Sequence, residues 1–283
     1  MKISMKRKVE DMPKVNLEKI LLVNEIKSGI FHMEIESPYI VDFSSPGQFI
    51  NIKCSEGLSP LLRRPISIAD VNKDTGSFSI YFKVVGDGTK LLSQMQVGDM
   101  LDFIGPLGNG FMIEDAFVNT AIIGGGIGCF PLLMLLKKVK SKNIYSFLGF
   151  DCEDSIMMEE EFSCLSKVAI TTEDLSKGKK RLVTEALKDS IQKGLIFDMI
   201  FACGPRAMLI EINKIAIENN IKCQLSLEEK MGCGIGSCLV CACKTKIQKE
   251  QENSSEKPDE EAWTYSRVCK EGPVFMGSEL IWE

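Results

Sequence analysis

The sequence predicts three parts in chain order: an antiparallel β-barrel, a Rossmann-like domain built on a parallel sheet, and a small C-terminal module. Short segments of alternating hydrophobicity precede residue 112, apolar strands alternate with helices up to residue 224, and a group of closely spaced cysteines follows. With 283 residues, of which 45% are hydrophobic, the chain is long enough to bury two cores and still carry a third module.

Residues 15–112 are predicted to form the barrel. Turn clusters such as SSPG and NKDTGS separate its alternating segments, which are LEKILLVNEI, GIFHMEIES, GQFINIKC, SIYFKVV and DMLDFIG. This pattern is typical of antiparallel strands with one buried face. His32, the only histidine, lies in one of these segments between apolar neighbours, and we expect it to be an ordinary strand residue rather than a catalytic one.

Residues 113–224 are predicted to form the Rossmann-like domain. The apolar run TAIIGGGIG is followed by the helical stretch CFPLLMLLKKVK, the strand NIYSFLGF, an acidic helix around 156–164, the strand KVAITT, a helix around 183–193, the apolar run LIFDMIFACG and a helix at about 208–219. Strands that alternate with helices predict a parallel sheet with helices on both faces.

Residues 225–283 are predicted to form a separate module, because they are too irregular to repeat either domain. Within this module the segment IQKEQENSSEKPDEEAW is charged and lacks hydrophobic periodicity. We therefore expect it to be a mobile surface loop.

Composition excludes several classes of protein. No apolar run approaches the roughly 18–20 residues of a membrane helix, and the basic N-terminal segment lacks the apolar stretch of a signal peptide, so we expect a cytoplasmic protein with no membrane contact. The net charge of −5 comes without a basic stripe, which argues against nucleic-acid binding. Eleven cysteines in a cytoplasmic chain favour metal or redox roles over a disulfide framework.

The cysteine spacing identifies one of those roles. In MGCGIGSCLVCAC, Cys233, Cys238 and Cys241 have the C-x4-C-x2-C spacing of plant-type [2Fe–2S] proteins. The interleaved glycines allow the main chain to approach the cluster and direct N–H groups at its sulfurs. The alternative is a zinc site, but zinc ligands usually come as two CxxC pairs, and this spacing fits that pattern poorly.

Two cysteines compete to be the fourth ligand. Cys243 lies only two residues beyond Cys241, whereas Cys269, in SRVCKEGPVF, follows the charged segment and can fold back to close the site. We expect Cys269 to be the ligand. The cysteines outside this group are expected to be idle free thiols, and they are Cys54, Cys129, Cys152, Cys164 and Cys223.

A flavin site is predicted on the barrel. A cluster carries one electron at a time and nicotinamide carries a hydride, so a chain that joins the two needs a flavin between them. LLRRPISI supplies an arginine fork and a hydroxyl suited to a pyrophosphate, and YFKVVGDGTKLL adds a glycine turn at a helix start. Taken alone, the first could be a surface strand and the second a hairpin turn. The candidate FAD residues are Arg64, Pro65, Ile66, Ser67, Tyr81, Phe82, Lys83, Gly88 and Thr89.

A nicotinamide site is predicted at the carboxyl edge of the parallel sheet. A glycine-rich turn follows a buried strand and precedes a helix, as a dinucleotide loop requires, although Cys129 breaks the strict GxGxxG pattern and such turns can be merely tight turns. Asp151 could accept a hydrogen bond from a ribose hydroxyl and favour NADH, or simply start a helix. The candidate NAD residues are Gly124, Gly125, Gly126, Gly128, Cys203, Gly204 and Pro205, with Cys203 also a candidate for positioning near the flavin–nicotinamide contact.

RxxS on a barrel strand, GDGT, GGGIG and CGPxxM, in this order, resemble the ferredoxin–NADP reductase superfamily. The added CxGxGxCxxCxC module makes nearly the whole chain similar to the electron-transfer subunits of class B dihydroorotate dehydrogenases, through RRPIS, VGDGT, MGCGIGSCLVCACKT and VCKEGPVF. The resemblance implies an FAD-binding barrel, an NAD-binding domain and a [2Fe–2S] module whose ligands are Cys233, Cys238, Cys241 and Cys269. The segment between the last two of these ligands is longer here than in that family.

The resemblance also implies a partner and an activity. The partner is an FMN-containing catalytic subunit that oxidises dihydroorotate to orotate in pyrimidine biosynthesis, in a heterotetramer of two plus two, with electrons passing through the cluster and FAD to NAD⁺. Two alternatives remain open at this point. One is the same module in another complex, such as an NADH-dependent ferredoxin–NADP oxidoreductase or a hydrogenase-type assembly, and the other is a zinc-binding interaction protein.

Overall fold

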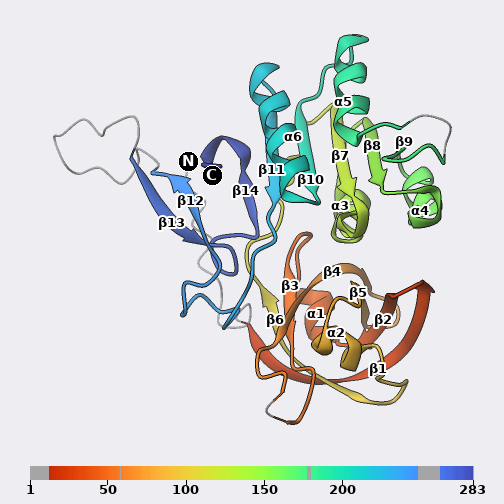
Figure 1. The fold of residues 1–283 in the computed structure, drawn as a ribbon, viewed down its shortest axis with the longest axis vertical. Coiled ribbons are helices and arrows are strands. Elements are labelled where there is room, and N and C mark those ends of the chain that lie inside the picture. Colours follow the sequence, from red (N-terminus) through yellow and green to blue (C-terminus); the bar gives the residue numbers. More distant parts are fainter. Residues whose placement is uncertain (1–12, 58, 177–179, 248–261, 283) are drawn as a thin grey trace.

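The computed structural model describes residues 13–57, 59–176, 180–247 and 262–282. Figure 1 shows a closed barrel formed by the N-terminal third of the chain and a sheet flanked by helices formed by the middle third. The C-terminal segment lies along one side of both and carries a two-stranded hairpin, β12–β13. This arrangement confirms the predicted order of barrel, Rossmann-like sheet and small C-terminal part.

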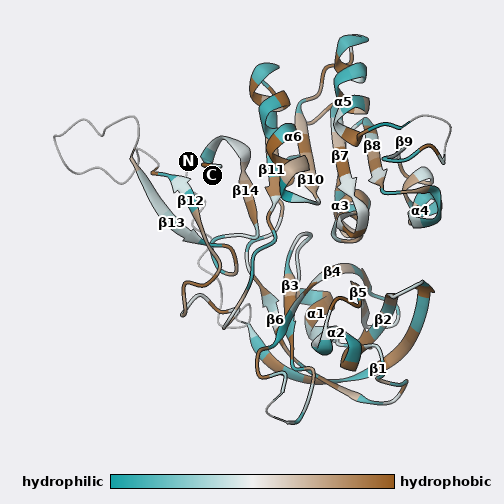
Figure 2. Cartoon of the chain, in the orientation of Figure 1, coloured by the Kyte–Doolittle hydropathy of each residue, from teal (hydrophilic) through white to brown (hydrophobic). Residues whose placement is uncertain are grey.

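Six antiparallel strands close the barrel in the order β1-β2-β5-β4-β3-β6. Their bounds are β1 (Lys14–Lys27), β2 (Ile30–Glu36), β3 (Phe49–Ile52), β4 (Arg64–Asn72), β5 (Ser77–Lys83) and β6 (Met100–Leu107). Two short helices, α1 (Pro38–Phe43) and α2 (Asp87–Leu92), lie in the connections. Figure 2 shows the alternating hydrophilic and hydrophobic bands along β1 that such a strand requires.

The barrel interior is filled by inward side chains such as Ile50, Ile52, Phe78 and Phe103. Helix α1 is not predicted by the strand pattern of this region. It begins where Ser37 Oγ accepts a hydrogen bond from Ile40 N and Pro38 occupies the first turn. An N-cap serine followed by proline is sufficient to start a helix, and the sequence SPYIVDF contains that signal.

The second sheet has the order β14-β11-β10-β7-β8-β9. Its strands β7 (Asn119–Gly125), β8 (Asn143–Phe150), β9 (Lys167–Thr172), β10 (Met199–Cys203) and β11 (Lys222–Ser226) are parallel, and β14 (Val274–Met276) is antiparallel to β11. The covering helices are α3 (Leu133–Lys138), α4 (Glu159–Ser163), α5 (Val183–Gln192) and α6 (Arg206–Glu218).

One predicted helix has a different form. The stretch from Cys129 to Lys140 begins as a 3₁₀ turn, η2 (Gly126–Leu132), and becomes α-helical only at Leu133. Pro131 lies inside the turn and lacks the N–H that an α-helical hydrogen bond would use. The dinucleotide loop therefore enters its helix through a tighter turn than the sequence suggests.

The C-terminal segment forms a hairpin of its own and also adds a strand to the second sheet. Its hairpin pairs β12 (Ala242–Lys246) with β13 (Trp263–Arg267), and its last strand, β14, extends the sheet of the middle third. The core of that sheet accordingly includes Cys241, Val268 and Phe275. The charged segment expected to be a mobile loop lies almost entirely outside the described residues. None of the described helices is long and apolar enough to cross a membrane.

Candidate metal centre and cofactor sites

The four cysteines predicted as cluster ligands form two adjacent pairs. The main-chain N–H of Cys233 points at Cys238 Sγ at 3.4 Å, and the N–H of Cys269 points at Cys241 Sγ, also at 3.4 Å. Cys241 and Cys269 are each 2% exposed, whereas Cys238 lies at the surface. The site therefore has a buried side toward the protein and an open side toward solvent.

The glycines of the cysteine loop let its main chain turn so that N–H groups point at the cysteine sulfurs. Gly234 and Gly236 have φ values of +71° and +85°, so the chain can curl around the thiols, and Ser237 N donates to Cys233 Sγ at 3.2 Å. Burial acts to raise the pKa of the Cys233 thiol, but the N–H groups of Ile235, Ser237 and Cys238 outweigh it and lower the pKa to about 6. This loop favours a thiolate before any metal is bound.

The pKa of Cys269, the predicted fourth ligand, is shifted in the opposite direction from that of Cys233. Burial and the adjacent Cys241 sulfur raise the pKa of the Cys269 thiol to about 12, against the main-chain N–H of Gly236. A buried thiol beside a second sulfur resists ionisation, as Cys269 does here, and a bound cation relieves that situation. The donor set thus fits a cationic centre.

The arrangement also bears on which centre is bound. No three His, Cys, Asp or Glu side chains within the described ranges converge as ligands of one metal ion would. A [2Fe–2S] cluster takes four cysteines, two on each iron, and the observed pairs of Cys233 with Cys238 and Cys241 with Cys269 suit that division. The residues present therefore fit a two-iron cluster.

Cys243, the competing fourth ligand, is partly buried, whereas Cys241 and Cys269 are fully buried in the same apolar core. It is on β12 opposite Ser266, and it packs against the apolar core of the sheet, which includes Trp282 as a peripheral member. Burial raises the pKa of its thiol to about 11. Cys269 is the cysteine next to Cys241, and its assignment as fourth ligand stays a prediction.

Arg267 is hydrogen-bonded to the main chain of the cysteine loop. Its Nη1 donates to Gly236 O at 2.7 Å, and Glu271 accepts from Arg267 N and Nε at 2.7 and 3.0 Å. The ion pair with Glu271 fixes the guanidinium, so the hydrogen bond to the loop is made by a pre-oriented group. Sequence reasoning did not single out this pair, since both residues resemble ordinary surface charges.

The two halves of the predicted FAD phosphate site come together in space. A Cβ placed on Gly88 would lie 2.6 Å from Arg64 Nε, so the guanidinium of β4 rests directly on the glycine at the start of α2. Arg64 Nη1 donates to Leu62 O at 2.5 Å. Thr89 has a different use from the one expected: its Oγ1 accepts from Val85 N at 2.9 Å and donates to Gly86 O at 3.0 Å, which closes the turn before the helix.

Tyr81 is the centre of an aromatic stack. The rings of His32 and Phe130 lie on its two faces, with centroids 4.4 and 4.3 Å away and interplanar angles of 9°. His32 Nε2 is 2.9 Å from Ser79 Oγ, and burial lowers the pKa of His32 despite the opposing effect of Glu34. The Tyr81 ring therefore clamps the barrel to the dinucleotide loop, and a flavin could meet only its edge or hydroxyl.

The remaining FAD candidates differ in whether their side chain or only their main chain is accessible to a cofactor. Phe82 is 1% exposed and its side chain fills the barrel, so only its main chain can reach a cofactor. Lys83 is exposed at the end of β5. On β4, Pro65 lies opposite Asn51 of β3 and Ser67 opposite Phe49.

The glycine loop of the predicted NAD site is mostly used for packing. Added Cβ atoms on Gly125 and Gly128 would meet Met208 Sδ at 2.7 Å and Cys203 O at 2.4 Å, and one on Gly124 would touch the Cys129 main chain at 3.0 Å. Gly126, with φ of +53°, has nothing within 4 Å of its Cβ position. Among these four, Gly126 is the glycine open to a ligand.

Cys203 lies where the strand ends meet. It pairs in register with Gly124 of β7 and Ser226 of β11, and a Cβ added to Gly204 would lie 3.0 Å from Gly125 N. Burial raises the pKa of the Cys203 thiol to about 12, although a hydrogen bond with Ser226 works against it. Pro205 precedes α6 and borders a cavity of about 130 Å³ together with Arg206 and Glu229.

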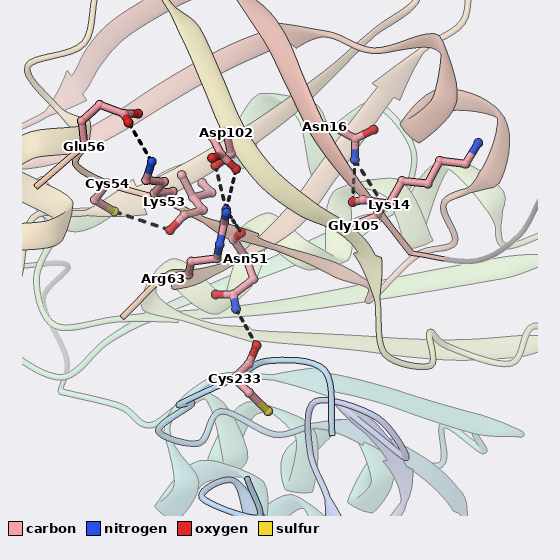
Figure 3. A network of polar contacts seen from close by, with 11 residues as sticks. Lys14, Asn16, Asn51, Lys53, Cys54, Glu56, Arg63, Asp102, Gly105 and Cys233 are labelled. Carbon is pink, nitrogen blue, oxygen red and sulfur yellow. Dashed lines mark hydrogen bonds and ion pairs between the residues drawn. The ribbon is translucent and has the colours of Figure 1, made fainter. Parts of the chain in front are cut away.

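Three further residues near the cluster went unnoticed in the sequence. Asn51 Nδ2 donates to Cys233 O at 3.2 Å, and Arg63 Nη1 donates to Asp102 O at 3.2 Å and pairs with Asp102 Oδ1 at 2.7 Å (Figure 3). The double arginine of RRPIS was the available signal, because Arg63 directly precedes β4, which begins at Arg64, and two adjacent residues of an extended chain point in opposite directions.

Two family descriptions match the chain. Residues 228–281 match the iron–sulfur cluster binding domain of dihydroorotate dehydrogenase B, and residues 19–111 match the oxidoreductase FAD-binding domain. A relative from Caldanaerobacter subterraneus subsp. tengcongensis is 39% identical over 267 residues, covering 93% of this chain and 97% of its own. A Bacillus cereus G9842 relative is 36% identical over 270 residues, covering 93% and 98%. Both relatives are named dihydroorotate dehydrogenase B (NAD⁺), electron transfer subunit.

A solved structure has the same architecture over nearly the whole chain. It is that of an NADH-dependent reduced ferredoxin–NADP oxidoreductase described in terms of flavin-based electron bifurcation, with a TM-score of 0.79 and 29% sequence identity. The alignment covers 96% of this chain and 92% of the other. This overall architecture therefore also occurs in a protein with a different name from that of the two relatives.

Proposed function

The chain belongs to the family of dihydroorotate dehydrogenase B electron-transfer subunits, and from this premise we propose that it carries electrons from an FMN-containing catalytic partner to NAD⁺. The observation that carries the proposal is the combination of two cysteine pairs, a barrel with an arginine fork and a glycine loop on one chain. When bound, the [2Fe–2S] cluster passes single electrons and FAD converts them to a hydride for NAD⁺.

The barrel residues would hold the FAD phosphates. Arg64 offers Nε and a second guanidinium nitrogen from a side chain already oriented by Gly88 and by Leu62 O. A planar fork of this kind matches phosphate oxygens in pairs. Ser67, two residues beyond Pro65 on β4, adds a hydroxyl on the same strand.

The edge of the parallel sheet would hold the nicotinamide nucleotide. Gly126 presents open main chain just beyond β7, and Cys203, at the end of β10, pairs in register with Gly124 of β7. A thiol whose pKa is about 12 stays neutral at physiological pH, so Cys203 would position the ring by packing and not act as a nucleophile. No proton needs to move through this side chain.

The partner would cover the open side of the cluster loop. Ile235, Leu239 and Val240 are 50%, 61% and 58% exposed around the exposed Cys238, an apolar surface beside the site where electrons from the partner must enter. Covering it would exclude water from the cluster. We infer a heterotetramer of two such chains with two catalytic subunits, in the cytoplasm, where the eleven free cysteines would stay reduced.

The test begins with anaerobic purification and a visible spectrum. We expect flavin and iron–sulfur absorbance together, bleached by NADH, and orotate formation from dihydroorotate when the FMN-containing subunit is co-expressed. A colourless protein containing zinc would overturn the cofactor assignment. Flavin and cluster with a co-purifying partner that does not oxidise dihydroorotate would instead place the chain in a complex like that of the 29% identical structure.

The glycine loop offers a matched pair of substitutions. Gly128→Ala would force a Cβ against the Cys203 carbonyl, so we expect a loss of about 1–3 kcal/mol of stability and a lower Tm. Gly126→Ala meets no atom within 4 Å, but a φ of +53° strains any residue with a Cβ, so it should cost about 1–2 kcal/mol of stability. The KM for NADH should rise about tenfold, because the methyl group occupies the ligand's side. Thermal unfolding and NADH-dependent dye reduction measure the two effects. The reverse pattern would contradict the assignment of the open glycine.

A further inference from the structure

We propose that Asn51 is the positioning residue that fixes the cluster loop against the flavin barrel and so controls electron passage between cluster and FAD. The inference rests on the proposed function, since it assumes that both cofactors are bound. Asn51 is 1% exposed on β3, and its neighbours Ile50 and Ile52 point into the barrel, which leaves Asn51 on the outer face under the loop (Figure 3).

The contact between the two parts is specific. Asn51 Nδ2 donates to Cys233 O at 3.2 Å, and because a main-chain oxygen can only accept, the amide NH₂ must face the loop. A Cβ on Gly234 would lie 2.3 Å from that nitrogen, so the glycine makes room for the amide. The first cluster cysteine is therefore held through its own main chain by a barrel side chain 182 residues earlier in the sequence.

Asn51 also lies next to β4, the strand predicted to bind FAD. Asn51 pairs in register with Pro65, which lies between Arg64 and Ile66 of the predicted FAD strand. Arg63 Nη1 donates to Asn51 O at 3.4 Å while paired with Asp102, which fixes the main chain of β3 at this point. One residue thus lies between the cysteine loop and the flavin strand and contacts or pairs with both.

Packing alone does not account for an amide at this position. Asn51 Oδ1 is buried and has no hydrogen-bond partner among the described residues. An apolar side chain of similar size would avoid that unpaired acceptor. Moreover, the C-terminal segment is held on the barrel elsewhere, because Asn109 N donates to Gly272 O at 2.5 Å and Asn109 Nδ2 to Glu271 O at 2.9 Å. Loss of the Asn51 amide should therefore loosen the loop without detaching the segment.

Asn16 provides a matched control. It is a second asparagine on the barrel, 8% exposed, and its Nδ2 donates to Lys14 O at 3.0 Å and Gly105 O at 3.4 Å. These partners belong to the barrel, so Asn16 shares the burial and chemistry of Asn51 without touching the cluster loop (Figure 3). Identical substitutions at both positions separate general barrel damage from the proposed role.

The experiment uses the full chain loaded with FAD and cluster, with NADH as the reductant. Asn51→Asp and Asn51→Leu are compared with Asn16→Asp and Asn16→Leu by stopped-flow absorbance, by EPR of the reduced cluster and by redox titration. We expect Asn51 variants to keep the wild-type rate of flavin reduction and to reduce the cluster about tenfold more slowly, the effect of losing one hydrogen bond. In Asn51→Asp the new carboxylate beside the loop should lower the cluster potential by about 59 mV, a tenfold change in its one-electron equilibrium.

Each outcome either supports or contradicts the proposed role of Asn51. Failure of Asn51→Leu to retain iron, with FAD bound and with Asn16→Leu fully loaded, would support the positioning role. Wild-type cluster reduction and potential in both Asn51 variants would overturn it, as would equal effects of the Asn16 variants. If NADH reduces neither centre in the wild type, the proposed function itself fails, and that outcome is separate from any difference between variants.

Discussion

Cys269→Ser is expected to abolish the [2Fe–2S] cluster while leaving the flavin in place. Cys269 is 2% exposed and its N–H lies 3.4 Å from Cys241 Sγ, so its sulfur closes the buried pair. Loss of a group that only orients a metal ligand typically costs about 10–100-fold in affinity, and loss of a ligand costs more. Iron content should fall from about two per chain to near zero, and the visible spectrum should become that of a flavin alone.

Cys243→Ser is the control for this experiment. Cys243 is not the predicted fourth ligand and its side chain packs on the sheet core, so the variant should keep its iron and lose only some stability. NADH should still reduce the flavin in both variants, since the barrel is separate from the cysteine pairs. Retention of iron in Cys269→Ser with loss in Cys243→Ser would reverse the ligand assignment.

The barrel and the parallel sheet could be predicted because their signals are local. Alternating hydrophobicity identifies strands such as β2 and β5, and KVAITT coincides with β9 at Lys167–Thr172. Strand β14 could not be assigned to the sheet in the same way. Its three residues, Val274–Met276, pair with β11 some fifty positions earlier, and a segment that short has no period of its own.

The candidate sites also contain some features with a local sequence signal and others without one. Cysteine spacing and the glycine turn are short-range patterns, so the metal-binding loop and the dinucleotide loop are visible in the sequence. Asn51 and the stack of His32, Tyr81 and Phe130 arise from contacts between distant segments. An isolated asparagine or histidine on a strand has no neighbours in the sequence that would reveal its partner, and its role follows only from the fold.

The shared architecture explains why the partner is harder to derive than the cofactors. FAD and the cluster are predicted to be held by residues inside this chain, such as Arg64 and the two cysteine pairs. Under the proposed function, partner choice would depend instead on exposed residues such as Ile235, Leu239 and Val240, which would contact another chain. Substituting these three should therefore change which complex forms without changing the visible spectrum of the chain.

Arg64→Ala is expected to leave the chain almost free of FAD. The guanidinium would supply two charge-assisted hydrogen bonds to the pyrophosphate, each worth roughly 1.5–3 kcal/mol, so the Kd for FAD should rise on the order of 100-fold or more. Arg64→Lys keeps the charge but not the planar fork, and an intermediate Kd is expected. Fluorescence titration of the flavin-depleted protein with FAD measures all three affinities.

Gly88→Ala tests the same site without removing the charge. A Cβ there would lie 2.6 Å from Arg64 Nε and 3.0 Å from Cζ, so the guanidinium must swing away and the FAD affinity should fall toward that of Arg64→Ala. Gly57→Ala, where nothing lies within 4 Å of the new methyl group, should bind FAD normally. Because both glycine variants keep Arg64, a loss confined to Gly88→Ala would show that the orientation of the fork, and not only its charge, sets the affinity. Wild-type affinity in Gly88→Ala would mean that Arg64 binds the phosphates from a different position than the one it holds here.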